Sequence, residues 1–380
     1  MIPRLIQEMV VNSLEELRKV ALIIGPRQAG KTTILKAIKN KFETDGMKVG
    51  YLNCDLAEDM SVVDNNSLTE LSRLVRDLDC LLVDEAQQLT NAGLTFKILY
   101  DNFPKLKLVA TGSSSFELKN QMSDAMTGRY VDFILYPPGL TELRGFENAR
   151  TADFIWPHIM LYGSYPEVYL QPKLELKRIL LDSIVESYLF KDVLAFSGIR
   201  NPQRIRDLTR ALAYQIGSEM NENELANRLK IDRKTVVAYL DVLEKAYVIK
   251  RLYPYSKNPR REIGRRYKVY FVDLGIRNAL IGDFNDIALR MDAEMVWENL
   301  LFMERMKRKV NLRSPVNNFF WRSYSGAEVD YLEVSGQKIA AWEFKFGLGK
   351  LSRGAREFEK IYKSKVTMVN IANLLEFVRP

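Results

Sequence analysis

The chain has 380 residues, of which 47% are hydrophobic and 27% charged, and this length exceeds one ordinary core, so two or three domains are expected. No apolar run approaches the roughly twenty residues of a membrane helix, and residues 1–11 lack a secretory signal pattern, which favours a cytoplasmic protein without membrane association. Two cysteines, Cys54 and Cys80, and one histidine argue against a disulfide framework, a His-rich metal site and Ser-His-Asp chemistry.

Charge is distributed unevenly along the chain. Residues 1–150 contain 18 Lys and Arg against 20 Asp and Glu, whereas residues 151–380 contain 38 against 28. Residues 200–268 alone hold 17 basic and 8 acidic groups. A basic segment beside a neutral one indicates a polyanionic partner, because Lys and Arg neutralise phosphates. The alternative is a solvated basic surface of the kind found in thermophile proteins.

The first 140 residues alternate between helices and apolar strands. A helix is expected at 14–20, and continuous apolar runs predict strands at 20–24, 49–53, 80–83 and 106–111. Such runs are typical of parallel strands that are covered on both faces. We therefore expect an α/β, doubly wound domain over residues 1–140. Tyr136-Pro137-Pro138-Gly139 breaks the pattern and is the expected exit from this domain.

Residues 25–32 read Gly-Pro-Arg-Gln-Ala-Gly-Lys-Thr and fit the phosphate-binding pattern G-x-x-x-x-G-K-[ST] at every fixed position. The pattern lies between a predicted strand and a predicted helix, as its mechanism requires. Lys31 would neutralise the β- and γ-phosphates, and Thr32 would ligate Mg²⁺. We therefore expect ATP and Mg²⁺ as cofactors, held by Gly25, Pro26, Arg27, Gln28, Ala29, Gly30, Lys31, Thr32 and Thr33.

Two further strands end in polar residues that suit a P-loop ATPase. The run 81–83 is followed by Asp84, expected in the Mg²⁺ shell, and by Glu85, expected to polarise the attacking water. The strand at 106–111 is followed by Gly112 and Ser113. Because ligands bind at the carboxyl ends of parallel strands, Ser113 or Thr111 is a candidate sensor of the γ-phosphate, although both can be simple turn residues.

Residues 141–217 read as a mostly helical linker or lid, and residues 218–285 as a winged helix. Helices at 222–229 and 233–246 precede strands at 247–252 and 267–272. The outer face of the second helix is expected to carry Tyr239 among its basic residues. Candidate DNA-binding residues on this helix and on the wing are Arg233, Lys234, Arg260, Arg261, Arg265 and Arg266. Many winged helices instead bind proteins or brace neighbouring domains, and that alternative remains open.

Residues 286–380 combine an amphipathic helix at 286–308 with three short strands within 317–346. Asp330 and Glu343-x-Lys345 resemble the core motif of PD-(D/E)XK nucleases. Period-two alternation places Glu343 and Lys345 on one face of a strand. The resemblance implies that Asp330 and Glu343 hold Mg²⁺, that Lys345 activates or positions water, and that Glu298 is the acidic helix residue of the fold. Cleavage and a non-catalytic binding role are both compatible with the motif.

Over nearly its whole length the chain resembles archaeal and bacterial AAA-type P-loop ATPases that carry a winged helix and a nuclease-like C-terminal domain. The motifs responsible are the phosphate loop, Val83-Asp84-Glu85-Ala86-Gln87, Thr111-Gly112-Ser113-Ser114, Gly128-Arg129, Leu161-Tyr162-Gly163-Ser164-Tyr165-Pro166-Glu167 and the C-terminal carboxylates. This resemblance implies a homo-oligomer in which Arg129 reaches the γ-phosphate of a neighbouring subunit. A surface salt bridge is the alternative role of Arg129.

Three functions follow from these features. The first is a Mg²⁺-dependent ATPase that couples ATP turnover to DNA binding, with metal-dependent DNA cleavage as an extension. The second is a regulatory or signalling ATPase whose winged helix and inactive nuclease-like domain mediate protein interactions. The third is a DNA-binding regulator that uses ATP as a slow switch. Salt-dependent DNA binding distinguishes the second from the other two.

Overall fold

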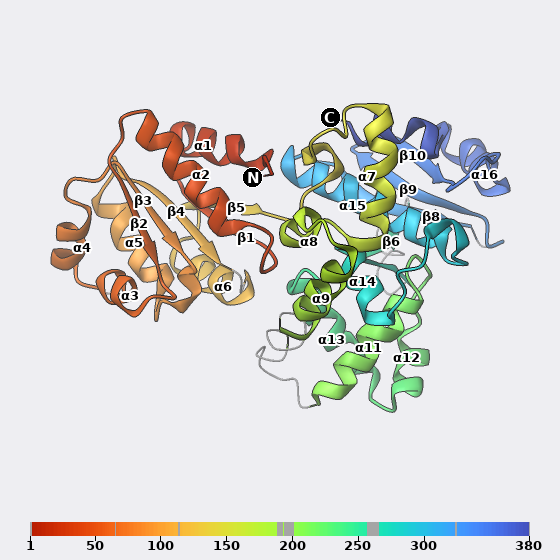
Figure 1. Ribbon diagram of the computed structural model, residues 1–380, viewed down its shortest axis with the longest axis horizontal. Coiled ribbons are helices and arrows are strands. Elements are labelled where there is room, and N and C mark those ends of the chain that lie inside the picture. The colour runs from red at the N-terminus through yellow and green to blue at the C-terminus, as the bar shows by residue number, and fades with distance from the viewer. Residues whose placement is uncertain are drawn as a thin grey trace. The chain divides into compact units, whose positions relative to one another are not determined.

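The computed structural model describes residues 2–64, 66–112, 115–187, 193, 201–256, 266–323 and 325–379, without the side chains of residues 115–117. The chain divides into two compact units (Figure 1). Unit 1 comprises residues 3–137 and unit 2 comprises residues 138–380. The division falls beside the expected exit from the first domain, whereas the three segments expected after it pack together as one unit.

Unit 1 is built on a five-stranded parallel sheet in the order β2-β3-β4-β1-β5. The strands are β1 (Val20–Ile24), β2 (Val49–Asn53), β3 (Cys80–Asp84), β4 (Lys107–Gly112) and β5 (Tyr130–Ile134). Strand β4 lies between the strand that precedes the phosphate loop and the strand that ends in Asp84. The sheet agrees with the expected parallel α/β architecture, and β5 is a strand that the sequence pattern did not reveal.

Helices cover both faces of this sheet, each face with its own hydrophobic core. Helices α1 (Ile6–Glu16) and α2 (Lys31–Thr44) cover one face (Figure 1). The other core includes residues from α3 (Ala57–Val63), α4 (Leu68–Val75), α5 (Ala92–Asn102) and α6 (Ser115–Ala125). The expected helix at 14–20 was misplaced, because the apolar stripe of α1 begins at Ile6 and residues 17–19 form the turn into β1.

The first part of unit 2 is helical, as expected. It contains α7 (Ala149–Tyr162), α8 (Pro166–Leu170), α9 (Leu174–Ile184), α11 (Pro202–Tyr214) and, later in the chain, α14 (Leu274–Ile281). Helix α14 packs against α7, α9 and α11. Two further helices, α12 (Glu222–Leu229) and α13 (Arg233–Lys245), precede an antiparallel hairpin of β6 (Ile249–Pro254) and β7 (Lys268–Phe271).

The hairpin is part of a larger sheet that crosses the boundary expected between residues 285 and 286. Strand β6 pairs in parallel with β8, which gives a six-stranded sheet in the order β11-β10-β9-β8-β6-β7. The additional strands are β8 (Asn317–Arg322), β9 (Glu328–Ser335), β10 (Lys338–Phe344) and β11 (Val366–Val369). The helices of this part are α15 (Ala293–Asn311), α16 (Arg353–Tyr362) and α17 (Leu374–Val378). Backbone hydrogen bonding therefore joins the hairpin to the C-terminal strands.

No helix among the described residues combines the length and apolar character needed to cross a lipid bilayer.

Candidate nucleotide-binding site

The phosphate loop connects the carboxyl end of β1 to the first turn of α2. Gly25 lies so close to the end of β5 that a Cβ atom there would come within 2.2 Å of the carbonyl oxygen of Leu135. Gly30 precedes α2 with a φ of 99°, a conformation that favours glycine. Helix α2 then directs its N-terminal backbone groups and the positive end of its dipole toward the loop, an arrangement that attracts phosphate.

Lys31 is folded back over the loop. Its side chain is 4% exposed, and its Nζ donates to the carbonyl oxygens of Gly25 at 3.1 Å and Pro26 at 2.9 Å. These neutral acceptors hold the ammonium beside the phosphate-binding backbone. A triphosphate is a stronger, anionic acceptor for the same group.

Arg4 is a part of the loop's surroundings that the sequence pattern did not reveal. It precedes α1, and its guanidinium donates to the carbonyl oxygen of Ala29 at 2.9 Å and to that of Tyr136. One side chain thus ties the middle of the phosphate loop to the residues that follow β5. The sequence offered no signal for this contact, because it joins positions 25 and 132 residues apart.

Asp84 lies at the end of β3, is 1% exposed and is bound by hydroxyl groups. Its carboxylate accepts hydrogen bonds from the hydroxyl of Tyr51 at 3.0 Å and from that of Thr111. Burial, followed by the charge of Asp84, raises the pKa of Tyr51 above its usual range, so this phenol remains a donor. Thr111 lies on β4, between the loop strand and β3, whereas Ser113 lies outside the described residues.

This arrangement suits a hard divalent cation. Asp84 forms no ion pair with any residue in the described part of the chain, so its buried negative charge has only neutral donors as partners. Carboxylate and hydroxyl oxygens are the ligand types that Mg²⁺ prefers. Asp84 and Thr32 would hold the ion, which would offset the charge of the phosphates when bound.

Glu85 follows Asp84 in a left-handed conformation, with a φ of 52°. Its backbone N–H donates to Asp84 Oδ1 and to Thr111 Oγ1, both at 3.2 Å, and its carboxylate accepts from the side-chain amide of Gln87. A non-glycine residue in this conformation is held there by its surroundings, a feature that is enriched at functional sites. The backbone thereby turns Glu85 out of the strand, while Gln87 fixes its carboxylate.

Arg129 lies at the opposite end of the sheet from the phosphate loop. Its carbonyl oxygen accepts from the N–H of Val20, the first residue of β1, whereas the loop follows the last residue of that strand. Five strand residues correspond to about 16 Å. The Arg129 guanidinium pairs with Asp101 at 3.0 Å on the surface. The structure therefore does not bring Arg129 to the loop of its own chain.

The candidate DNA-binding residues are only partly described. Arg233 and Lys234 are exposed in the first turn of α13, and Arg233 pairs with Glu222 at 2.6 Å. Arg266 is exposed before β7, whereas Arg260, Arg261 and Arg265 lie outside the described residues. The expectation that Tyr239 faces outward was wrong. It is 5% exposed because it belongs to the buried stripe of α13 with Val236, Leu240 and Leu243.

The carboxylates of the nuclease-like motif are bound by protein donors. Asp330 on β9 accepts from the N–H of Phe344 at 2.7 Å, and burial followed by the charge of Glu298 raises the pKa of Asp330 to about 7. Both oxygens of Glu343 accept from the N–H of Ser352, at 3.1 and 2.9 Å, and Lys345 pairs with Glu343 at 3.2 Å.

In the described part of the chain, these carboxylates do not belong to a cluster that could hold a metal ion. Glu298, Asp330 and Glu343 are all described residues, yet no three Asp, Glu, His or Cys side chains in the described part of the chain are arranged to hold a metal ion. The structure therefore gives no support to a nuclease metal held jointly by these three residues.

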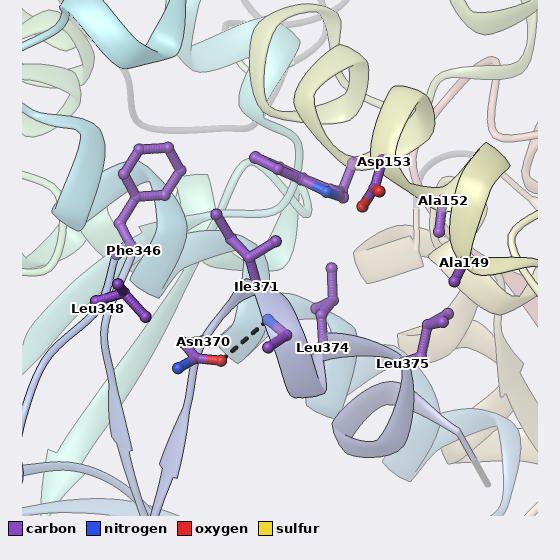
Figure 2. A pocket seen from close by; sticks show the side chains of 12 residues that line it. Ala149, Ala152, Asp153, Phe346, Leu348, Asn370, Ile371, Leu374 and Leu375 are labelled. Carbon is purple, nitrogen blue, oxygen red and sulfur yellow. Dashed lines mark hydrogen bonds between the residues drawn. The ribbon is translucent and has the colours of Figure 1, made fainter.

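A cavity of about 500 Å³ lies elsewhere in unit 2 and contains none of the predicted site residues. Figure 2 shows Ala149, Ala152 and Asp153 of α7 on one side of it, with Asn370, Ile371, Leu374 and Leu375 opposite them. Within its wall, Trp156 contacts Phe346 edge-on, with 6.0 Å between ring centroids. The lining residues are Ala149, Ala152, Asp153, Trp156, Phe346, Gly347, Leu348, Asn370, Ile371, Ala372, Leu374 and Leu375.

Comparisons with known proteins agree with the geometry of unit 1. Residues 17–144 match the family model of the AAA domain, which supports a P-loop AAA-type ATPase domain. Residues 154–286 and 293–375 match two families described as domains of unknown function, DUF8612 and DUF4143. These two matches divide unit 2 near the end of α14 and assign no activity to it.

Two similar proteins that span most of this chain are uncharacterized. An uncharacterized protein of Haemophilus influenzae is 24% identical, covering 76% of this chain and 74% of that protein. An uncharacterized protein of Mycobacterium tuberculosis is 28% identical, covering 84% of this chain and 68% of that protein. A solved structure of the replication initiator DnaA bound to AMPPCP and single-stranded DNA is 19% identical, with a TM-score of 0.34, covering 64% of this chain and 90% of that one. A likeness this small carries no functional conclusion.

Proposed function

We propose that the protein is a Mg²⁺-dependent ATPase that engages DNA through unit 2. The observation that carries the ATPase part is the buried Asp84 carboxylate, which has only neutral donors among the described residues and ends β3 of the sheet that bears the phosphate loop. Lys31 would exchange its two carbonyl acceptors for phosphate oxygens. Glu85 would orient the attacking water and accept its proton, and Thr111 would keep Asp84 in position.

Hydrolysis would require a rearrangement around Glu85. Its carboxylate accepts from the Gln87 amide, and this contact competes with a water molecule for the same oxygen. The side chain of Gln87 lies close to β4, since a Cβ at Gly112 would come within 2.8 Å of Gln87 Oε1. A change at the end of β4 on nucleotide binding would therefore move Gln87 and release Glu85.

The DNA part of the proposal is supported by charge and exposure. Lys234 and Arg233 are exposed at the N-terminus of α13, where the helix dipole also favours phosphate, and Arg266 is exposed at the start of the hairpin's second strand. The surrounding residues 200–268 carry 17 basic and 8 acidic groups. Such a segment suits backbone contacts that do not depend on base sequence.

A second candidate is an ATPase in which this region makes protein contacts. It is favoured by the pairing of β6 with β8, which makes the hairpin a structural part of a six-stranded sheet. The ion pair between Arg233 and Glu222 also neutralises one of the exposed cations. In this case the basic surface would meet an acidic protein.

ATPase rates measured with and without duplex and single-stranded DNA would test the proposal. We expect DNA to stimulate turnover, with binding that weakens as salt concentration rises. The variant Lys234→Ala should weaken binding and flatten this salt dependence, whereas Lys105→Ala, in unit 1, should not. Turnover that is unaffected by DNA, together with no salt-dependent binding, would favour the protein-contact role.

A further inference from the structure

The acidic centre of unit 2, which comprises Glu298, Glu328 and Asp330 together with Lys268, contains its own cation. Lys268 is the first residue of β7 and is 3% exposed. Its Nζ pairs with Glu298 Oε1 at 2.8 Å and also with Glu328. One ammonium thus joins three elements, because Glu298 belongs to α15 and Glu328 begins β9.

The three carboxylates of this centre also accept hydrogen bonds or ion pairs from other groups of the protein. The hydroxyl of Tyr270, also on β7, donates to Glu298 Oε1 at 2.6 Å. Arg322 pairs with Glu328 at 3.4 Å and with Glu219 at the same distance. Asp330 accepts from a backbone N–H of β10. A divalent ion bound by Glu298 and Asp330 would lie next to the Lys268 ammonium and be repelled by it in a poorly hydrated environment.

The charge of Lys268 is fixed by these contacts. Burial alone lowers the pKa of an ammonium, but the charges of Glu298 and Glu328 outweigh burial and raise the pKa of Lys268 well above its usual range.

From this geometry we infer that the Lys268 ammonium neutralises the acidic centre in place of a divalent metal, so that unit 2 is a non-cleaving, metal-independent assembly element. The ammonium fastens the β6–β7 hairpin to α15 and β9. Helices α12 and α13 and the hairpin are thus joined to the C-terminal strands in two ways. One is the pairing of β6 with β8, and the other is the set of ion pairs that Lys268 makes. Unit 2 would then hold a partner without cutting it.

Isothermal titration of the full chain with Mn²⁺, without nucleotide, tests this inference. The wild type and the control Lys338→Met, at an exposed lysine of β10, should show no Mn²⁺ site that depends on Asp330. Lys268→Met keeps most of the aliphatic side chain and removes the charge. It should gain one Mn²⁺ site that the wild type lacks, because a nearby like charge is gone. Adding Asp330→Asn should abolish that site.

Two results would overturn the inference. The first is activity of the wild type at Asp330: either Mn²⁺ binding that Asp330→Asn abolishes, or nicking of plasmid DNA with Mg²⁺ or Mn²⁺ that Asp330→Asn abolishes. The second is a folded Lys268→Met variant, judged by circular dichroism, that gains no Mn²⁺ site. Should Lys268→Met fail to fold, the wild-type titration and the nicking assay decide the question, since the inference requires both to be negative.

Discussion

The hydroxyl of Tyr51 donates a hydrogen bond to the carboxylate of Asp84 across 3.0 Å, from the edge strand β2 to the end of β3. It leaves Asp84 oriented by two hydroxyls, one from each neighbouring strand. A residue that orients a metal ligand contributes to metal affinity without touching the metal. Tyr51 is therefore a positioning residue of the candidate ATPase site.

We predict that Tyr51→Phe weakens the apparent Mg²⁺ affinity of the ATPase about tenfold, as expected for loss of a partner that orients a metal ligand. Binding of ATP in EDTA should change little. The measurement is turnover as a function of free Mg²⁺. Tyr130→Phe, which removes a hydroxyl that contacts Ser123 on another part of unit 1, is the matched control. An unchanged Mg²⁺ dependence in Tyr51→Phe would show that Asp84 does not rely on this contact.

We predict that Glu85→Gln binds Mg-ATP normally and hydrolyses it at least about 100-fold more slowly. Removing a general base typically costs 10²–10⁴-fold in rate, whereas the phosphate contacts remain intact. Single-turnover assays with labelled ATP measure the chemical step directly. Hydrolysis close to the wild-type rate would assign the base to another residue.

We predict that Arg129→Ala binds ATP but loses turnover, and that mixing it with Lys31→Ala restores part of the activity. Arg129 lies about 16 Å from its own loop along the strand, so it would act on the loop of a neighbouring subunit. In a mixed oligomer, the intact Arg129 of a Lys31→Ala subunit would reach the intact loop of an Arg129→Ala subunit. Asp101→Ala removes only the surface partner of Arg129 and should retain activity. No recovery on mixing, or equal losses in Asp101→Ala and Arg129→Ala, would assign Arg129 a structural role.

We predict that His158 makes the folded protein sensitive to acid. Burial, followed by the nearby Lys177 charge, lowers the pKa of His158 to about 4. The folded state thus takes up this proton less readily than the unfolded chain. The neutral imidazole's contribution to stability is complete above the ordinary histidine pKa of about 6.5 and is lost as pH falls toward 4.

The measurement is urea unfolding of the wild type and His158→Gln between pH 7.5 and 4.5. The wild type should lose about 2 kcal/mol more unfolding free energy than the variant over this range. Because the chain has a single histidine, the difference between the two proteins isolates this group. Parallel pH profiles would show that His158 is protonated equally in both states.

The elements that build the candidate nucleotide-binding edge of unit 1 could be predicted because contiguous motifs encode them. The phosphate loop, Asp84, Glu85 and the four expected strands all lie where local patterns placed them. The contacts of Tyr51, Gln87 and Arg4 with this edge were not predicted, since only the folded sheet or its surroundings create them. Strand β5 was also not predicted, since Asp132 interrupts its apolar run.

Prediction was weaker in unit 2 because its key relationships are long-range. The order of helices and strands followed from periodicity, but the parallel pairing of β6 with β8 joins residues more than sixty positions apart. The D…ExK spacing indicated a metal site, and nothing in that spacing reveals a lysine arriving from β7. Lys268 lies 30 residues from Glu298 and 60 from Glu328, so only the fold shows that the centre has its own cation.

Calorimetry of nucleotide binding shows whether the loop at residues 25–32 binds the phosphates of Mg-ATP. We predict saturable binding of Mg-ATP to the wild type and to Lys36→Ala, which removes an exposed lysine from the next turn of α2. Lys31→Ala should lose binding or weaken it by at least about 100-fold, since a charge-assisted contact is removed from a buried site. Equal affinities in Lys31→Ala and the wild type, or no heat of binding in any of the three, would show that this loop does not bind the phosphates.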